Sequence, residues 1–250
     1  MKHRLLVALL ATALAAPAAA LAALPAPIAK AAADPARAAD AKIDARRKGP
    51  ELLAFAEVKP GQKVYDLIPG GGYFTRLFSL AVGPAGKVYS VWPEEYDKVS
   101  HPDSDVLRKQ AATAPFTNVK VLVQPGKAFN APEPLDLVFT SQNYHDYPDK
   151  FMGHIDPAVL DKAVFKALKP GGLFVVVDHR AKAGAGMKDT DTLHRIDIAA
   201  VKSQVTAAGF RFEGESNLLA NPKDPLDIAV FDPKVRGHTD QFILKFRKPR

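Results

Sequence analysis

The stretch VYDLIPGGGYFTR, residues 64–76, places three consecutive glycines between a short apolar run and a segment with helical periodicity. An apolar run of that length, bounded by a Gly/Pro turn, is typical of a buried strand. The residues after the glycines place apolar side chains on one side, as a helix packed on a sheet requires: Phe74, Leu77, Phe78 and Leu80. A strand, a glycine turn and a helix in this order predict an α/β fold whose backbone can approach a nucleotide-like ligand closely.

Strand and helix patterns alternate along most of the remaining chain. We expect five strands in a doubly wound, mostly parallel sheet with right-handed crossovers, at residues 63–68, 87–92, 118–124, 134–142 and 173–179. A helix with a Pro-Gly-Gly stop is expected over 157–172, before the fifth strand, and another helix over 192–210. Two final strands, 210–219 and 241–248, have no helix pattern between them, which favours an antiparallel C-terminal hairpin and a seven-stranded sheet.

The first 22 residues have the layout of a secretory signal: a basic start, an apolar stretch and a small-residue end. Cleavage after Ala22 would leave a flexible leader and a helix over 23–49, followed by one domain over 50–250. The protein is therefore expected to be periplasmic or secreted. The alternative is an uncleaved membrane anchor. No other stretch is long and apolar enough to cross a bilayer, so no membrane span is expected after cleavage.

Composition narrows the function classes further. The chain contains no cysteine, which excludes disulfides, thiolate metal sites and cysteine nucleophiles. The net charge of +7 is spread over 250 residues without a basic run interleaved with aromatics, so no nucleic-acid partner is expected. The sequence offers no basis for an oligomeric state.

The glycines do not match the common phosphate-binding motifs. GxxxxGK[ST] is absent, and the dinucleotide pattern GxGxxG fails at its third glycine, where Thr75 stands. The better match includes Asp66 at the end of the strand, four residues before Gly70. This Asp-x-x-x-Gly-x-Gly pattern resembles the first motif of class I S-adenosylmethionine (SAM)-dependent methyltransferases, with Ile68 in place of the first glycine.

The resemblance extends over residues 50–250 and includes PGGGYFT, NYHD, HRID, AAGF and TDQFILKFRKP. The chain is similar to a group of bacterial predicted methyltransferases that often carry export signals. The resemblance implies SAM as cofactor. It also implies that Asp66 holds the loop or faces the methionine ammonium, and that Trp92 stands where an acid usually binds the ribose. Trp92 would stack on adenine or close the edge of the core. The implied cofactor-binding residues are Asp66, Gly70, Gly71, Gly72, Trp92, Glu94, Asn130 and Asn143.

Candidate catalytic residues follow the fourth and fifth strands, at the carboxyl edge of the sheet where such folds place their sites. His145 is the candidate general base, because a neutral imidazole accepts a proton near neutral pH. Asp146 and Asp178 are expected to orient it or the substrate, and Tyr144, His179 and His194 to contact the substrate. The alternative is that His145 and Asp146 only cap a loop. No metal site is expected, because His145, Asp146, Asp178 and His179 lack a tight ligand spacing.

The sequence thus predicts a SAM-dependent methyltransferase acting on O or N of a small molecule. The main alternative is an exported, non-catalytic protein that binds a nucleoside or small molecule on the same scaffold. The predicted export and Trp92 favour that alternative, whereas Asp66 and the polar NYHD and DHR segments favour an enzyme. A nicotinamide-dependent oxidoreductase is disfavoured by Thr75 and the terminal hairpin.

Overall fold

The structure, a computed structural model, describes residues 24–100 and 103–250. The predicted signal segment, residues 1–22, lies outside the described residues, as does the first residue of the predicted leader. In the part of the chain that is described, no helix combines the length and the hydropathy needed to cross a bilayer.

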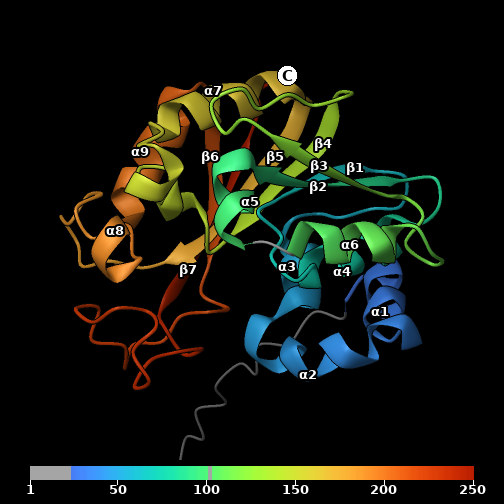
Figure 1. The fold of residues 1–250 in the computed structure, drawn as a ribbon, viewed down its shortest axis with the longest axis horizontal. Helices are drawn as coiled ribbons and strands as arrows, with labels where there is room; N and C mark the ends of the chain where they lie inside the picture. Colours follow the sequence, from blue (N-terminus) through green and yellow to red (C-terminus); the bar gives the residue numbers. More distant parts are fainter. Residues whose placement is uncertain (1–23, 101–102) are drawn as a thin grey trace, which may run out of the picture.

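The core of the molecule is one seven-stranded sheet with the strand order β3-β2-β1-β4-β5-β7-β6 (Figure 1). The first five strands are parallel to one another, and β7 runs antiparallel to both β5 and β6. The predicted doubly wound α/β sheet and its antiparallel C-terminal hairpin are therefore confirmed. The strands are β1 (Lys63–Leu67), β2 (Lys87–Pro93), β3 (Val119–Gln124), β4 (Leu135–Ser141), β5 (Leu168–His179), β6 (Arg211–Ser216) and β7 (Gln241–Arg247).

Helices cover both faces of the sheet because the central strands are apolar on both sides. On one face, α4 (Tyr73–Val82) packs with α1 (Ala26–Ala32) and α3 (Gly49–Phe55), and its Leu77 and Phe78 are fully buried. On the other face lie α7 (Pro157–Ala167) and α9 (Ile198–Ala207). The remaining helices are α2 (Ala38–Arg47), α5 (Glu94–Ser100), α6 (Asp103–Ala111), α8 (Thr190–Leu193) and the short 3-10 turns η1 (Pro35–Arg37), η2 (Tyr144–Asp146) and η3 (Lys150–Met152).

The N-terminal segment differs from the predicted flexible leader and single helix. Residues 26–47 form α1, η1 and α2, and Ile28 of α1 is 0 % exposed within the core under α4. Arg76 of α4 donates two hydrogen bonds of 2.7 Å to the carboxylate of Asp40 in α2. The apolar pair Ile28 and Ala31, one helical turn apart, packs α1 into the same core.

Two helix predictions are also revised. The segment 192–210 is not one helix: α8 ends at Leu193, His194 takes a left-handed conformation with φ of +53°, and Asp197 caps a new helix by accepting from the Ala199 N–H. The helix expected over 157–172 ends at Ala167, before its predicted Pro-Gly-Gly stop, because the KPGG segment already belongs to β5. The first revision places His194 on a turn at the rim of the sheet.

Candidate active site

A cavity of about 610 Å³ lies at the carboxyl ends of β1, β4 and β5. This is where doubly wound sheets bind their ligands, and the volume falls within the usual range for small-molecule sites. Seven of the predicted site residues line it: Gly70, Gly71, Asn143, His145, Asp146, His179 and His194.

The glycine turn forms one wall of this cavity. Gly70 and Gly72 have φ values of +51° and +78°, and a Cβ built on Gly70 or Gly71 would meet no atom within 4 Å. Ile68 also takes a positive φ, +51°, although this region is unfavourable for a β-branched residue. The turn therefore keeps its left-handed backbone at the position where the glycine is replaced. The open space above Gly70 and Gly71 fits a group that lies directly against the main chain.

Asp66 is placed behind this turn and not in the cavity. Its side chain is buried, and its Oδ2 accepts a 2.6 Å hydrogen bond from the Thr75 hydroxyl of α4. Burial raises the pKa of this carboxyl to about 7, against the opposing effect of the Thr75 bond. Of the two predicted roles of Asp66, the geometry favours holding the loop.

Three other predicted cofactor residues do not reach the cavity, and Gly72 does not line it either. Trp92 is 0 % exposed and closes the core. Glu94 is exposed at the start of α5, and Asn130 is exposed beyond β3. Glu95, next to Glu94, accepts a hydrogen bond from the Gly126 N–H and so ties α5 to the loop after β3. The structure thus places no carboxylate from the end of β2 in this cavity.

His145 is held by Asp178, which is fully buried near the end of β5. Asp178 Oδ2 accepts from the His145 backbone N–H at 2.8 Å, and Oδ1 accepts from the ring Nδ1 at 2.7 Å. Because Asp178 Oδ1 fixes Nδ1, the Nε2 atom is the one directed toward Asp146 and His194 on the cavity wall. The predicted orienting role thus falls to Asp178.

The charge state of this cluster is set by its carboxylates. Burial disfavours a charged imidazole, yet Asp178 and Asp146 outweigh it and raise the pKa of His145 well above 6.5. Burial alone would raise the pKa of Asp146, but its hydrogen bonds with His145 and His194 lower it to about 2. The two carboxylates therefore favour a positive charge at this point of the cavity wall.

The remaining predicted residues take different positions. Asn143 lines the cavity, and its Nδ2 lies 3.3 Å from Asp146 Oδ2. His179 also lines it, with Nδ1 bonded to the Thr239 hydroxyl at 2.7 Å, and burial lowers its pKa to about 4. Tyr144 does not face the cavity, because its hydroxyl donates to Asp161 at 2.9 Å within the core.

Sequence reasoning missed the residues that α2, α4 and α5 contribute to the wall. Arg47, at the end of α2, donates to the Ser141 hydroxyl at 3.0 Å and stacks on Tyr73 and Phe74. Burial lowers the pKa of the guanidinium. Arg47 shares the cavity wall with the glycine turn. Tyr96 of α5 also lines the cavity. The sequence feature that could have pointed to Arg47 is the basic end of a helix just before Gly49-Pro50.

A second cavity, of about 830 Å³, lies at the opposite edge of the sheet, beside the amino ends of β1, β2 and β3. Its titratable lining residues are Lys30, Asp34 and Lys87. These three residues include no histidine and belong to no cluster of candidate catalytic groups. The cavity at the carboxyl ends is therefore the candidate active site.

Comparison with known proteins identifies the fold of this chain. No family model matches the chain. The chain is 31% identical over 122 residues to "Ubiquinone/menaquinone biosynthesis C-methyltransferase UbiE" of Pasteurella multocida (strain Pm70), which covers 48% of this chain and 41% of that protein. It is 26% identical over 132 residues to "Protein-L-isoaspartate O-methyltransferase" of Ignicoccus hospitalis, which covers 51% of this chain and 54% of that protein. The chain thus spans about half the length of the curated relatives it matches.

Solved structures match over most of the chain. A SAM-dependent methyltransferase from Aquifex aeolicus has a TM-score of 0.59 at 18% identity, covering 88% of this chain and 96% of that one. The glycopeptide N-methyltransferase MtfA complexed with SAM has a TM-score of 0.54 at 16% identity, covering 81% and 87%. The [4+2]-cyclase SpnF has a TM-score of 0.61 at 16% identity, covering 82% and 80%. This chain therefore has the fold of the class I SAM-dependent methyltransferases.

Proposed function

We propose that the protein is a SAM-dependent methyltransferase that modifies O or N of a small molecule. One observation carries the proposal: a cavity with a bare glycine turn on one side has the titratable groups His145, Asp146 and His194 on its wall. The similarity to SAM-dependent methyltransferases supports the choice of cofactor. SpnF, a cyclase by name, has a comparable fold, so the proposal rests on the site as well as on the fold.

The residues around the glycine turn are suited to hold SAM. Gly70 and Gly71 leave the main chain open, so an adenosine or methionine portion has room against it. Arg47 offers a guanidinium to the carboxylate of the amino-acid end, a pairing that such forked donors favour. When bound, SAM supplies a methyl group on a sulfonium that is already activated for transfer. The protein then has only to orient the acceptor and to manage its proton.

The polar rim is suited to the acceptor. His145, Asp146 and His194 together provide hydrogen-bond donors and acceptors within one small region of the cavity wall. Asp178 fixes the ring of His145, so the atom that faces this region is defined. Such fixed polar groups favour a small acceptor bearing an O–H or N–H.

The alternative function is a non-catalytic protein that binds a nucleoside or small molecule on this scaffold. The burial of Trp92 and the exposure of Glu94 favour it, because neither leaves an acidic partner for a ribose at the end of β2. Export, predicted from residues 1–22, is part of that alternative and remains a proposal.

Calorimetry separates these functions. Titration of the purified protein with SAM, S-adenosylhomocysteine and NAD is expected to show micromolar binding of the first two and none of NAD. A His145→Gln variant is expected to keep the SAM affinity and to lose methyl transfer to a panel of small O–H and N–H acceptors. Absence of any nucleoside binding would reject the methyltransferase proposal. Binding without turnover on any acceptor would favour the non-catalytic alternative.

A further inference from the structure

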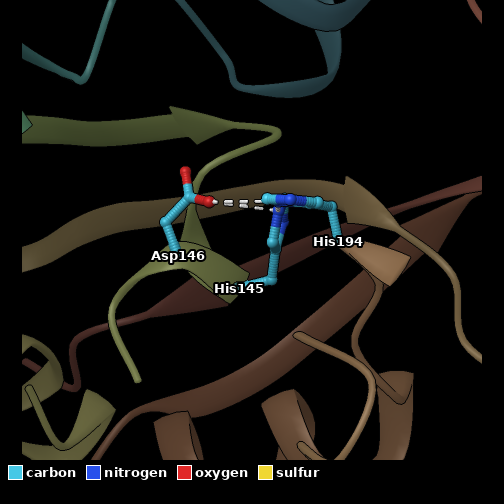
Figure 2. A group of neighbouring side chains, drawn as sticks. All are labelled: His145, Asp146 and His194. Carbon is cyan, nitrogen blue, oxygen red and sulfur yellow. Dashed lines mark hydrogen bonds and ion pairs between the residues drawn. The ribbon is translucent and has the colours of Figure 1, made fainter. Parts of the chain in front are cut away.

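Three side chains on the cavity wall turn their ligand atoms toward one point. Figure 2 shows Asp146 with the rings of His145 and His194 beside one of its carboxylate oxygens. His145 and Asp146 come from η2, after β4, whereas His194 follows α8, nearly 50 positions later. The fold, and not a local sequence motif, therefore assembles this cluster.

The spacing of the three atoms suits a metal ion. His145 Nε2 lies 3.2 Å from Asp146 Oδ1 and 3.4 Å from His194 Nδ1, and the third edge, His194 Nδ1 to Asp146 Oδ1, is 3.8 Å. Ligands about 2.0–2.1 Å from a tetrahedral ion are about 3.3–3.4 Å apart. Two of the three distances match this spacing. The third, between His194 and Asp146, matches after a small rotation of the His194 ring, which is 27 % exposed.

The groups behind the ligands support the same interpretation. Asp178 accepts from His145 Nδ1 at 2.7 Å, which directs the Nε2 lone pair of a neutral ring toward the shared point. Asn143 Nδ2 lies 3.3 Å from Asp146 Oδ2, the carboxylate oxygen that does not face the histidines. A carboxylate–histidine–metal arrangement of this kind is common in protein metal sites and raises the basicity of the ligand.

Local charge also favours a cation. Asp146 and Asp178 are both buried and place two carboxylates around His145. With neutral imidazoles as ligands the cluster carries two negative charges, which a divalent ion would neutralise. Nitrogen and oxygen ligands without sulfur suit zinc and its neighbours in the first transition row.

We propose that His145, Asp146 and His194 bind one divalent first-row transition-metal ion, Zn²⁺ foremost, with an open coordination position facing the cavity. Three protein ligands and one free position are typical of catalytic and not of structural zinc sites. The proposal differs from the expectation of no metal, which considered His145, Asp146, Asp178 and His179 as possible ligands and did not consider His194. If the proposed methyl transfer also holds, the open position selects acceptors whose oxygen or nitrogen can ligate the ion.

The test is zinc binding by the full-length protein without a polyhistidine tag, stripped with EDTA and titrated with ZnCl₂ in a calorimeter. Wild type is expected to bind one Zn²⁺ with micromolar or tighter affinity. The variant His194→Asn is expected to bind Zn²⁺ about 100-fold or more weakly. Asparagine is chosen because it tolerates the left-handed backbone at this position. His238→Asn, which changes an exposed histidine outside the cluster, is the matched control and is expected to bind as wild type.

Two further measurements keep the outcome interpretable. Circular dichroism and thermal melting check that His194→Asn is folded, and ZnCl₂ is expected to raise the melting temperature of wild type but not of the variant. Asp178→Asn is expected to weaken zinc binding about 10–100-fold while keeping the 1:1 stoichiometry. The proposal is overturned if wild type shows no saturable zinc binding, or if folded His194→Asn binds zinc as tightly as wild type. Because no SAM is present, neither result bears on the proposed methyl transfer.

Discussion

Asp178 accepts hydrogen bonds from both the backbone N–H and the ring Nδ1 of His145, and so ties the loop after β4 to the end of β5. Each of its oxygens has a defined donor, and Oδ1 also accepts from the His179 N–H. One carboxylate therefore fixes both the position of the loop and the orientation of the ring that faces the cavity.

The substitution Asp178→Asn is expected to destabilise the protein as well as to reduce turnover. The amide has a single acceptor oxygen, so it can keep the hydrogen bonds of only one of the two carboxylate oxygens, and it removes the negative charge beside the buried ring of His145. The free energy of unfolding in urea is expected to fall by about 3 kcal/mol. Asp227→Asn removes a carboxylate from an exposed ion pair with Lys182 and is expected to leave the free energy of unfolding nearly unchanged. Equal stabilities of the two variants would argue that Asp178 does not hold the loop after β4 and the ring of His145 in place.

Gly71→Val is expected to weaken SAM binding strongly without unfolding the protein. A Cβ at Gly71 meets no atom within 4 Å, so the fold without cofactor has room for the valine side chain. That side chain would occupy the space next to the turn where SAM is proposed to bind. The loss in calorimetric affinity is expected to be at least tenfold, about 1.4 kcal/mol. Gly214→Val, at an equally open position on β6, is the control. Unchanged SAM affinity in folded Gly71→Val would place the cofactor elsewhere.

Arg47→Gln is expected to weaken SAM binding about tenfold or more, because a charged hydrogen bond contributes about 1.5–3 kcal/mol. The neighbouring Arg46 is exposed and does not line the cavity, so Arg46→Gln is the matched control. Both affinities are measured by the same titration. Similar affinities in the two variants would exclude Arg47 from the cofactor site, since both changes remove one positive charge from α2.

The sequence predicted the elements that depend on local pattern. Apolar runs such as that of β4 and the glycine turn after β1 identified the parallel sheet, and the missing helix before β7 identified the hairpin. The same reasoning placed His145 and Asp146 at the carboxyl edge, because both follow a strand directly. It could not place Asp66 or Trp92, since their depth in the core depends on how the helices cover the strands.

The missed parts of the site come from long-range packing. Arg47 reaches the cavity only because α1 and α2 dock on α4, and a charged, alanine-rich segment gives little sign of that docking. His194 was assigned to a helix by periodicity, whereas Asp197 starts the helix later and leaves His194 on a turn. A cluster that joins η2 to this turn has no sequence spacing from which it could be found.

Asp161 of α7 gives a prediction about pH that is independent of the active site. It is fully buried, its Oδ2 accepts from the Tyr144 hydroxyl at 2.9 Å, and burial raises its pKa to about 7 from an ordinary value of 3.8. The folded state therefore binds a proton that the unfolded state releases above about pH 4. The stability that this proton provides is complete below pH 4 and is lost as pH rises through about 7.

Between pH 5 and pH 8 the contribution of Asp161 to the free energy of unfolding is expected to fall by about 2–3 kcal/mol, because one pKa unit corresponds to about 1.4 kcal/mol. Asp161→Asn keeps an acceptor for Tyr144 but cannot titrate, so its unfolding free energy should decline less over this range than that of wild type. Urea unfolding of both proteins at pH 5, 6, 7 and 8 measures the difference. Asp66, with a pKa also raised to about 7, titrates in both proteins and cancels in the comparison. Parallel pH profiles would show that Asp161 is already ionised at pH 5 in the folded protein.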